Sequence, residues 1–209
     1  MDSTRAGSGS PVAGLVLAAG AGRRYGRPKA LVEVRGRLLV ERAVATLAAG
    51  GCDSVAVVLG ADAESVAARA DLAGATVVVN PEWAGGMGSS LRAGLAALTP
   101  TPAVAVLVLL VDMPGITPEA VRRLVGLAAP QVLAMAGYHT GRGHPVLLGR
   151  AHWAGVAASA VGDVGARPYL RERAEQIRVV PVADVADCGD IDTEADRARF
   201  LAAGEAASA

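Results

Sequence analysis

The chain has 209 residues, of which 52% are hydrophobic and 3% aromatic, and its 20 basic and 20 acidic residues give a formal net charge of zero. This length fits one domain that buries roughly 70–75% of the surface of its unfolded chain. Zero net charge and few aromatic rings argue against a nucleic-acid partner and against binding to an anionic membrane surface.

Residues 1–11 are polar and lack the basic-then-apolar order of a signal peptide, so we expect a disordered N-terminal tail. The longest apolar run, 103–111, is shorter than the ~18 residues that a membrane-spanning helix needs. Cys52 and Cys188 do not have the paired spacing of a zinc site. We expect a soluble, cytoplasmic protein with a single domain over 12–203 and a frayed C-terminus over 204–209.

Apolar runs of strand length alternate with segments whose apolar residues recur at helical spacing. The expected strands are 12–18, 54–59, 75–79, 103–111, 131–138, 142–148 and 177–182. The expected helices are 40–49, 63–70, 117–128, 150–161 and 169–174. Two more are expected from their caps: one is capped by Ser89 or Ser90 and runs to Leu98, and the last is capped by Thr193. This alternation predicts an α/β fold with a mainly parallel sheet.

The first predicted strand runs into a basic loop of small residues, 19–29. A Walker A loop is excluded because Arg27 follows Gly26, and a dinucleotide fingerprint is excluded because Tyr25 stands where it needs a small residue. The loop offers backbone N–H groups from 18–22 and the cations of Arg23, Arg24 and Lys29, which are the groups that a triphosphate needs. The alternative is a solvated basic loop.

Asp112 directly follows the apolar run 103–111, and Met113–Pro114 delay the next helix. An aspartate at the carboxyl end of a strand favours a metal ligand or a catalytic group over a helix cap. Mg²⁺ is often held by one or two carboxylates together with substrate phosphates. The segment DIDTEAD supplies further carboxylates, Asp190 and Asp192, although Asp192 or Thr193 can instead cap the last helix.

Other polar residues carry weaker signals. The segment GMGSS around Ser89 is not the G-x-S-x-G elbow of serine hydrolases. The histidines follow no zinc-protease pattern, and His144 in an apolar segment is more typical of a packed residue than of a catalyst. Asp163 and Arg167, in the loop 162–168, are expected either to contact a substrate or to pair with each other.

Several of these segments, taken in order, resemble one family. LAAGAGRRYGRPKAL is similar to the LAAGxSxRMGxxKxLL signature of nucleotidyltransferases, and NPEWAGGMGSSLRAGL is similar to N-x-x-W-x-x-G-M-x-S-S-L-x-x-G. LLVDMPGIT contains the D-x-P strand end, and GHPVLL, GDVGARPYL and DIDTEAD match GHPVLF, GDxGAR and DIDTPED. From about Val12 to Leu201, the chain resembles molybdenum cofactor cytidylyltransferases and their MobA-like relatives.

The resemblance implies a three-layer α/β/α, Rossmann-like nucleotidyltransferase fold. It also implies a Mg²⁺-dependent enzyme that transfers CMP from CTP to the phosphate of a molybdopterin-type acceptor and releases pyrophosphate. A molybdoenzyme or its chaperone would then be a partner. A guanylyltransferase, a transferase for another phosphorylated metabolite and a non-catalytic cofactor-binding maturation factor remain alternatives.

The resemblance also assigns roles to residues. Lys29, Arg23 and Asp112 are the implied catalytic residues, Asp112 and Asp190 the metal ligands with Asp192 as an alternative, and His144 lies toward the acceptor. The implied nucleotide-binding residues are Leu17, Ala18, Ala19, Gly20, Ala21, Gly22, Arg23, Lys29, Asn80, Gly86, Met87, Ser89 and Ser90. The chain departs from the family signature at two positions: Tyr25 replaces the usual methionine, and Ala21 replaces the usual serine of the loop.

Overall fold

The computed structural model describes residues 10–206. Residues 1–9 of the predicted disordered tail and 207–209 of the predicted frayed end lie outside the described residues. The last helix, α7 (Glu194–Ala206), continues to Ala206, so the described part of the predicted frayed end, 204–206, is helical. Among residues 10–206, no helix is both long enough and apolar enough to span a bilayer.

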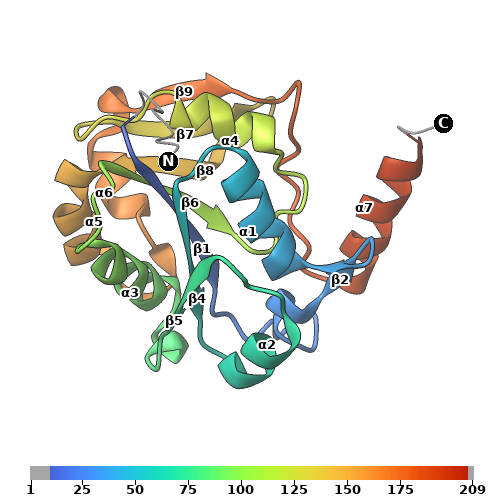
Figure 1. The fold of residues 1–209 in the computed structure, drawn as a ribbon. Helices are drawn as coiled ribbons and strands as arrows, with labels where there is room; N and C mark the ends of the chain where they lie inside the picture. The colour runs from blue at the N-terminus through green and yellow to red at the C-terminus, as the bar shows by residue number, and fades with distance from the viewer. Residues whose placement is uncertain (1–9, 207–209) are drawn as a thin grey trace, which may run out of the picture.

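Seven strands form one sheet in the order β5-β4-β1-β6-β8-β7-β9 (Figure 1). Six of them run parallel, and β8 is antiparallel to its neighbours β6 and β7, which confirms a mainly parallel sheet. The seven strands are β1 (Val12–Ala18), β4 (Ser54–Leu59), β5 (Ala75–Val79), β6 (Ala105–Leu110), β7 (Leu133–Tyr138), β8 (Gly141–Gly149) and β9 (Arg178–Pro181). A separate short hairpin, which turns at Arg35–Gly36, consists of β2 (Glu33–Val34) and β3 (Arg37–Leu38).

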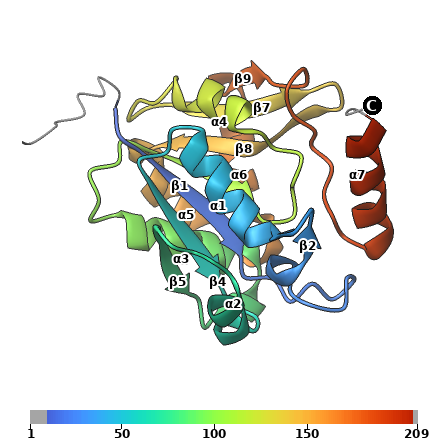
Figure 2. The ribbon, with the colours of Figure 1, turned by 45° about the vertical axis from the view of Figure 1, so that its right-hand side comes forward.

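Helices cover both faces of this sheet, which confirms the three-layer α/β/α architecture (Figures 1 and 2). The side chains of α1 and α4 pack on one face, and those of α3, α5 and α6 pack on the other. The helices other than α7 are α1 (Leu39–Ala49), α2 (Ala63–Arg69), α3 (Met87–Leu98), α4 (Pro118–Val125), α5 (Trp153–Ser159) and α6 (Arg167–Glu172).

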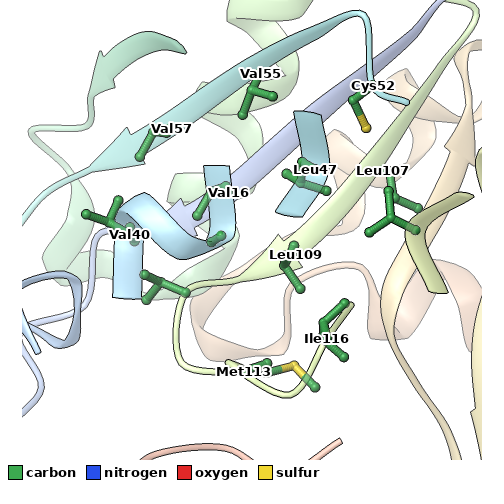
Figure 3. Close-up of a cluster of buried hydrophobic side chains, with 14 of the residues drawn as sticks. Val16, Val40, Leu47, Cys52, Val55, Val57, Leu107, Leu109, Met113 and Ile116 are labelled. Carbon is green, nitrogen blue, oxygen red and sulfur yellow. The ribbon is translucent and has the colours of Figure 1, made fainter. Parts of the chain in front are cut away.

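The core forms because every residue of β1 is buried, so alternate side chains supply the two helix layers. Val16 packs in the cluster that contains Leu47 of α1 and Leu109 of β6 (Figure 3), and Leu15 packs in the cluster of α3. Burying a leucine or valine side chain stabilises the folded state by about 1.5–3 kcal/mol. This doubly covered strand is therefore a rigid base for the loop that follows it.

Several predicted helix bounds are wrong. Helix α6, expected over 169–174, begins at Arg167 and ends at Glu172, and α4, expected over 117–128, ends at Val125. Helix α3 begins at Met87 with Gly86 at its N-cap, so Ser89 and Ser90 lie inside its first turn and do not cap it. They are buried and hydrogen-bonded to Asn80 instead. The helix expected over 150–161 begins as a 3₁₀ turn, Arg150–His152, and continues as α5 only to Ser159.

Candidate active site

A cleft of about 370 Å³ opens at the carboxyl ends of β1 and β6. This is where open α/β sheets bind their ligands. It is lined by Leu17, Ala19, Gly20, Ala21, Gly22, Arg23, Arg24, Lys29, Trp83, Ala84, Gly86, Met87, Ser90, Leu110, Val111, Asp112, Asp163 and Asp192. Most of the predicted site residues therefore meet in one place. The exceptions, which do not line the cleft, are Ala18, Asn80, Ser89, His144 and Asp190.

The loop after β1 doubles back on itself at Gly22. The backbone N–H groups of Tyr25 and Gly26 both donate to the carbonyl oxygen of Gly22, at 2.9 and 2.8 Å. Gly22 has φ +61°, and a Cβ there would lie 1.9 Å from the carbonyl oxygen of Arg27. Only glycine fits this turn without strain. The turn shapes the loop so that Arg23, Arg24 and Lys29 all reach the cleft.

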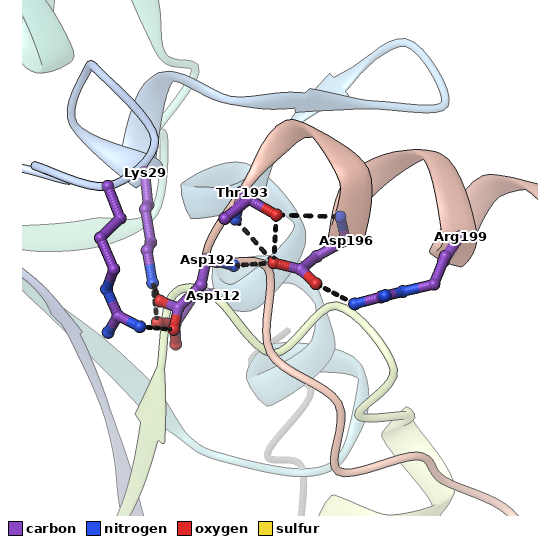
Figure 4. Close-up of polar contacts among 7 residues, drawn as sticks. Lys29, Asp112, Asp192, Thr193, Asp196 and Arg199 are labelled. Carbon is purple, nitrogen blue, oxygen red and sulfur yellow. Dashed lines mark hydrogen bonds and ion pairs between the residues drawn. The ribbon is translucent and has the colours of Figure 1, made fainter.

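The ammonium of Lys29 bridges two carboxylates (Figure 4). Its Nζ lies 2.7 Å from Oδ2 of Asp112 at the end of β6, and it also contacts Oδ1 of Asp192. Arg24 pairs with the other oxygen of Asp192, at 2.8 Å. Burial works to lower the pKa of Lys29, but the hydrogen bonds to Asp112 and Asp192 outweigh it and raise the pKa above 10.5. Lys29 is therefore a fixed positive charge at neutral pH.

Three carboxylates at this point can hold a divalent cation. Asp112, Asp190 and Asp192 each offer an oxygen, and these oxygens lie within 4.8 Å of one another. Oδ1 of Asp112 is buried and has no hydrogen-bond partner among the described residues. A buried carboxylate oxygen without a partner is costly, and a hard cation with oxygen ligands satisfies it. The residues present therefore fit a divalent metal.

The backbone holds these acids together. The N–H of Ile191 donates to the carbonyl oxygen of Asp112 at 2.8 Å, which fixes the segment 190–192 against the end of β6. Asp192 then leads into α7, where the hydroxyl oxygen of Thr193 accepts from the N–H of Asp196 at 3.3 Å, as predicted for a cap (Figure 4). A second contact, from the hydroxyl of Tyr25 to Glu194, ties α7 to the loop after β1.

The opposite wall of the cleft is the start of α3. Gly86 has φ +96°, and a Cβ there would lie 2.5 Å from the carbonyl carbon of Gly162, so glycine allows the loop 162–165 to approach. Asp163 lies on that loop and accepts from the N–H of Met87 at 3.3 Å. No ion pair between Asp163 and Arg167 is found among the described residues. Asp163 lines the cleft, and its contact with a substrate stays a prediction.

Behind this wall, Asn80 makes hydrogen bonds to both serines of α3. Its Nδ2 donates to Oγ of Ser89 at 2.9 Å and to Oγ of Ser90 at 3.1 Å. Asn80 and Ser89 do not line the cleft, and Ser90 does.

His144 lies on β8, and its burial lowers the pKa of the imidazole to about 4, an effect that the charge of Arg167 adds to and that of Asp112 opposes. It is therefore a neutral residue near the acids and not part of the cleft wall.

Arg24, one of the three cations expected for a triphosphate, lines the cleft and pairs with Asp192. The family resemblance, by contrast, assigned only Arg23 and Lys29 to the phosphates. The signal was in the motif spacing: when LAAGxSxRMGxxK is counted from Leu17, its arginine falls on Arg24 and its serine on Gly22. The departure from the motif is thus at Gly22, and the assignment to Ala21 is wrong by one position.

Comparison with known proteins gives one family. A model of the MobA-like NTP transferase domain matches residues 14–177. The nicotine blue oxidoreductase of Paenarthrobacter nicotinovorans is 41% identical over 198 residues, which is 91% of this chain and 96% of that protein.

Solved structures agree with the fold. The Mycobacterium sp. strain JC1 homologue of Rv0371c has a TM-score of 0.80 at 32% identity, covering 92% of this chain and 96% of that one. Rv0371c of Mycobacterium tuberculosis in complex with manganese has a TM-score of 0.77 at 28% identity, covering 93% of this chain and 99% of that one.

Proposed function

Because this chain belongs to the family of the MobA-like NTP transferase domain, we propose that it transfers CMP from CTP to the phosphate of a molybdopterin-type acceptor. The observation that carries the proposal is the contact of Lys29 with Asp112 and Asp192 beside the loop 19–28. A triphosphate needs cations and N–H donors, and its metal needs carboxylates. The cleft brings both sets together.

In the proposed reaction, an oxygen of the acceptor phosphate bonds to the α-phosphorus of CTP. The bond from that phosphorus to the bridging oxygen breaks, and pyrophosphate leaves with the electron pair. Lys29, Arg23 and Arg24 hold the phosphates, with N–H donors from 18–22. Asp112, Asp190 and Asp192 would hold Mg²⁺, which when bound neutralises charge on the phosphates. The chain's own contribution is positioning and charge, which is most of what phosphoryl chemistry requires.

A second candidate function rests on the 41% identity to a protein named nicotine blue oxidoreductase. In this reading, the same cleft binds an aromatic acceptor of electrons, with Trp83 in its wall. The loop after β1 argues against a nicotinamide dinucleotide bound in the usual way, because Tyr25 and Pro28 break that fingerprint.

The test is a panel of reactions with purified protein. Pyrophosphate release is measured with CTP, GTP, ATP and UTP, each with and without the pterin acceptor and with Mg²⁺ or Mn²⁺. Oxidation of NADH and NADPH is measured in parallel with nicotine blue. Pterin-dependent release from CTP supports the proposal. Release only with GTP identifies a guanylyltransferase, and acceptor-dependent dinucleotide oxidation identifies the oxidoreductase. Nucleotide binding without turnover in any assay identifies a binding factor.

A further inference from the structure

Three polar side chains, Asn80, Ser89 and Ser90, are buried together behind the wall of the cleft, with exposures of 3, 5 and 4%. Asn80 follows β5, and its backbone N–H donates to the carbonyl oxygen of Leu59 at 2.8 Å. Ser90 is the member of the three that lines the cleft. Buried polar groups require partners, so the direction of every proton in this cluster matters.

The orientation of the Asn80 amide is fixed by its neighbours. The backbone N–H of Glu82 donates to Oδ1 of Asn80 at 3.0 Å, so the other end of the amide must be Nδ2. Nδ2 faces the two serine oxygens, at 2.9 and 3.1 Å. An amide NH₂ group only donates, so both serine oxygens accept from Asn80 and must send their own protons elsewhere.

The two serines then differ. The hydroxyl of Ser89 donates to the carbonyl oxygen of Glu82 or of Gly86, each at 2.9 Å. The hydroxyl of Ser90 makes no hydrogen bond in the described part of the chain other than the one it accepts from Asn80. Its proton is therefore free to point into the cleft.

We propose that Asn80 is a positioning residue for the nucleotide: it occupies a lone pair of Ser90, so that Ser90 donates to an acceptor atom of the nucleoside. This inference rests on the proposed binding of an NTP in the cleft. Asn80 thus influences nucleotide affinity without touching the ligand, whereas the family resemblance implies that it binds the nucleotide directly.

Replacing Asn80 by aspartate reverses the polarity of the cluster at nearly constant size. The carboxylate accepts from Glu82 and from both serines, so the proton of Ser90 turns away from the cleft and a lone pair faces the ligand. A neutral hydrogen bond contributes about 0.5–1.5 kcal/mol, which corresponds to roughly 2- to 12-fold in affinity. We expect N80D to weaken nucleotide binding by an amount in this range or above it.

The experiment is a double-mutant cycle on CTP affinity, measured by calorimetry and by tryptophan fluorescence, to which Trp83 in the cleft wall contributes. The variants are Asn80→Asp, Ser90→Ala and the double variant. The matched control is Thr99→Val at the end of α3, because Thr99 donates its proton to the carbonyl oxygen of Leu95 and is not a lining residue. Thermal unfolding of each variant reports on folding.

The expected result is that N80D and S90A each weaken binding and that the double variant binds no worse than S90A. The KM for CTP rises while kcat is unchanged, and T99V binds like the wild type. Additive losses, as a structural role of Asn80 would give, overturn the inference. If N80D does not fold, Asn80→Ala enters the same cycle with the same expectation. Wild-type protein that binds no NTP overturns the proposed function, and this inference with it.

Discussion

Lys29 and Asp112, 83 residues apart in the chain, form a direct ion pair of 2.7 Å between Nζ and Oδ2. They meet because β1 and β6 are parallel neighbours, so the loop after one strand lies beside the end of the other. In the proposed reaction, the ammonium of Lys29 binds the phosphates and the carboxylate of Asp112 binds the metal. Without ligands, each neutralises the other.

Removal of either partner should abolish most nucleotidyl transfer. Lys29→Ala and Asp112→Ala fold, because both residues lie at the end of the sheet and not in its core, and each lowers kcat by about 10²–10³-fold. The measurement is pyrophosphate release from CTP with the acceptor, alongside thermal unfolding. Arg27→Ala is the control, since Arg27 does not line the cleft. Wild-type rates in K29A or D112A would reject the assignment.

Arg24 should oppose metal binding when no nucleotide is present. It pairs with one oxygen of Asp192 at 2.8 Å, while Lys29 takes the other oxygen. Arg24→Gln frees one oxygen, so the affinity for Mn²⁺ alone should rise by up to about 5-fold, the value of an exposed ion pair. With CTP bound, Arg24 contacts the phosphates instead of Asp192, so the difference in Mn²⁺ affinity between Arg24→Gln and the wild type should disappear. Calorimetry with Mn²⁺ tests this against Arg27→Gln, and a variant R24Q that binds Mn²⁺ more weakly without nucleotide would contradict it.

The cap of α7 should matter for both stability and nucleotide affinity. Thr193→Ala removes the acceptor for the N–H of Asp196 and should cost about 0.5–2 kcal/mol of stability. Because Thr193 follows Asp192 directly, the KM for CTP should also rise. Thr117→Ala removes the equivalent cap of α4, which accepts from Ala120 at 3.3 Å, and should cost only stability. Urea unfolding measures the effect on stability, and steady-state kinetics measures the effect on the KM for CTP. An unchanged KM in T193A would show that α7 does not position Asp192.

His144 should make the protein less stable in weak acid. Its pKa is about 4 in the folded chain against 6.5 ordinarily, because burial disfavours the charged ring. The unfolded chain therefore binds the extra proton first, so the free energy of unfolding is unaffected above pH 6.5 and falls as the pH drops toward 4.

Unfolding in urea across this range measures the slope. His144→Gln should flatten it, whereas His139→Gln, at an exposed position, should leave it as in the wild type. A slope that is the same in H144Q and in the wild type would assign the acid sensitivity to other groups.

Much of the fold could be predicted because its strands are short and apolar. Val12–Ala18, Ser54–Leu59 and Ala75–Val79 were predicted at the bounds that the structure gives, since glycine, aspartate or asparagine punctuates each run. The family resemblance, carried by motifs in order along the chain, is confirmed by the match to the MobA-like NTP transferase domain.

The features that could not be predicted depend on contacts between side chains that lie far apart in the sequence. Serine favours the N-cap position of a helix, which is why Ser89 and Ser90 are predicted as caps. In the structure both lie within α3, and their hydroxyl oxygens accept hydrogen bonds from Asn80. The sequence likewise does not show that Asp192, and not Asp190, contacts Lys29 and Arg24; Asp190 and Asp192 both stay candidate metal ligands. Such choices depend on loop geometry over distances of a few ångströms.

The most direct test of nucleotidyl transfer follows the α-phosphate of labelled CTP. Wild-type protein, the pterin acceptor and Mg²⁺ are incubated with CTP labelled at that position, and the label is traced in the acceptor and in the pyrophosphate. We expect label in the acceptor, unlabelled pyrophosphate in equal amount, and transfer by D112A that is slower by about 100-fold or more. Label that stays in CTP under all metal and acceptor conditions, from protein that binds CTP, would contradict it.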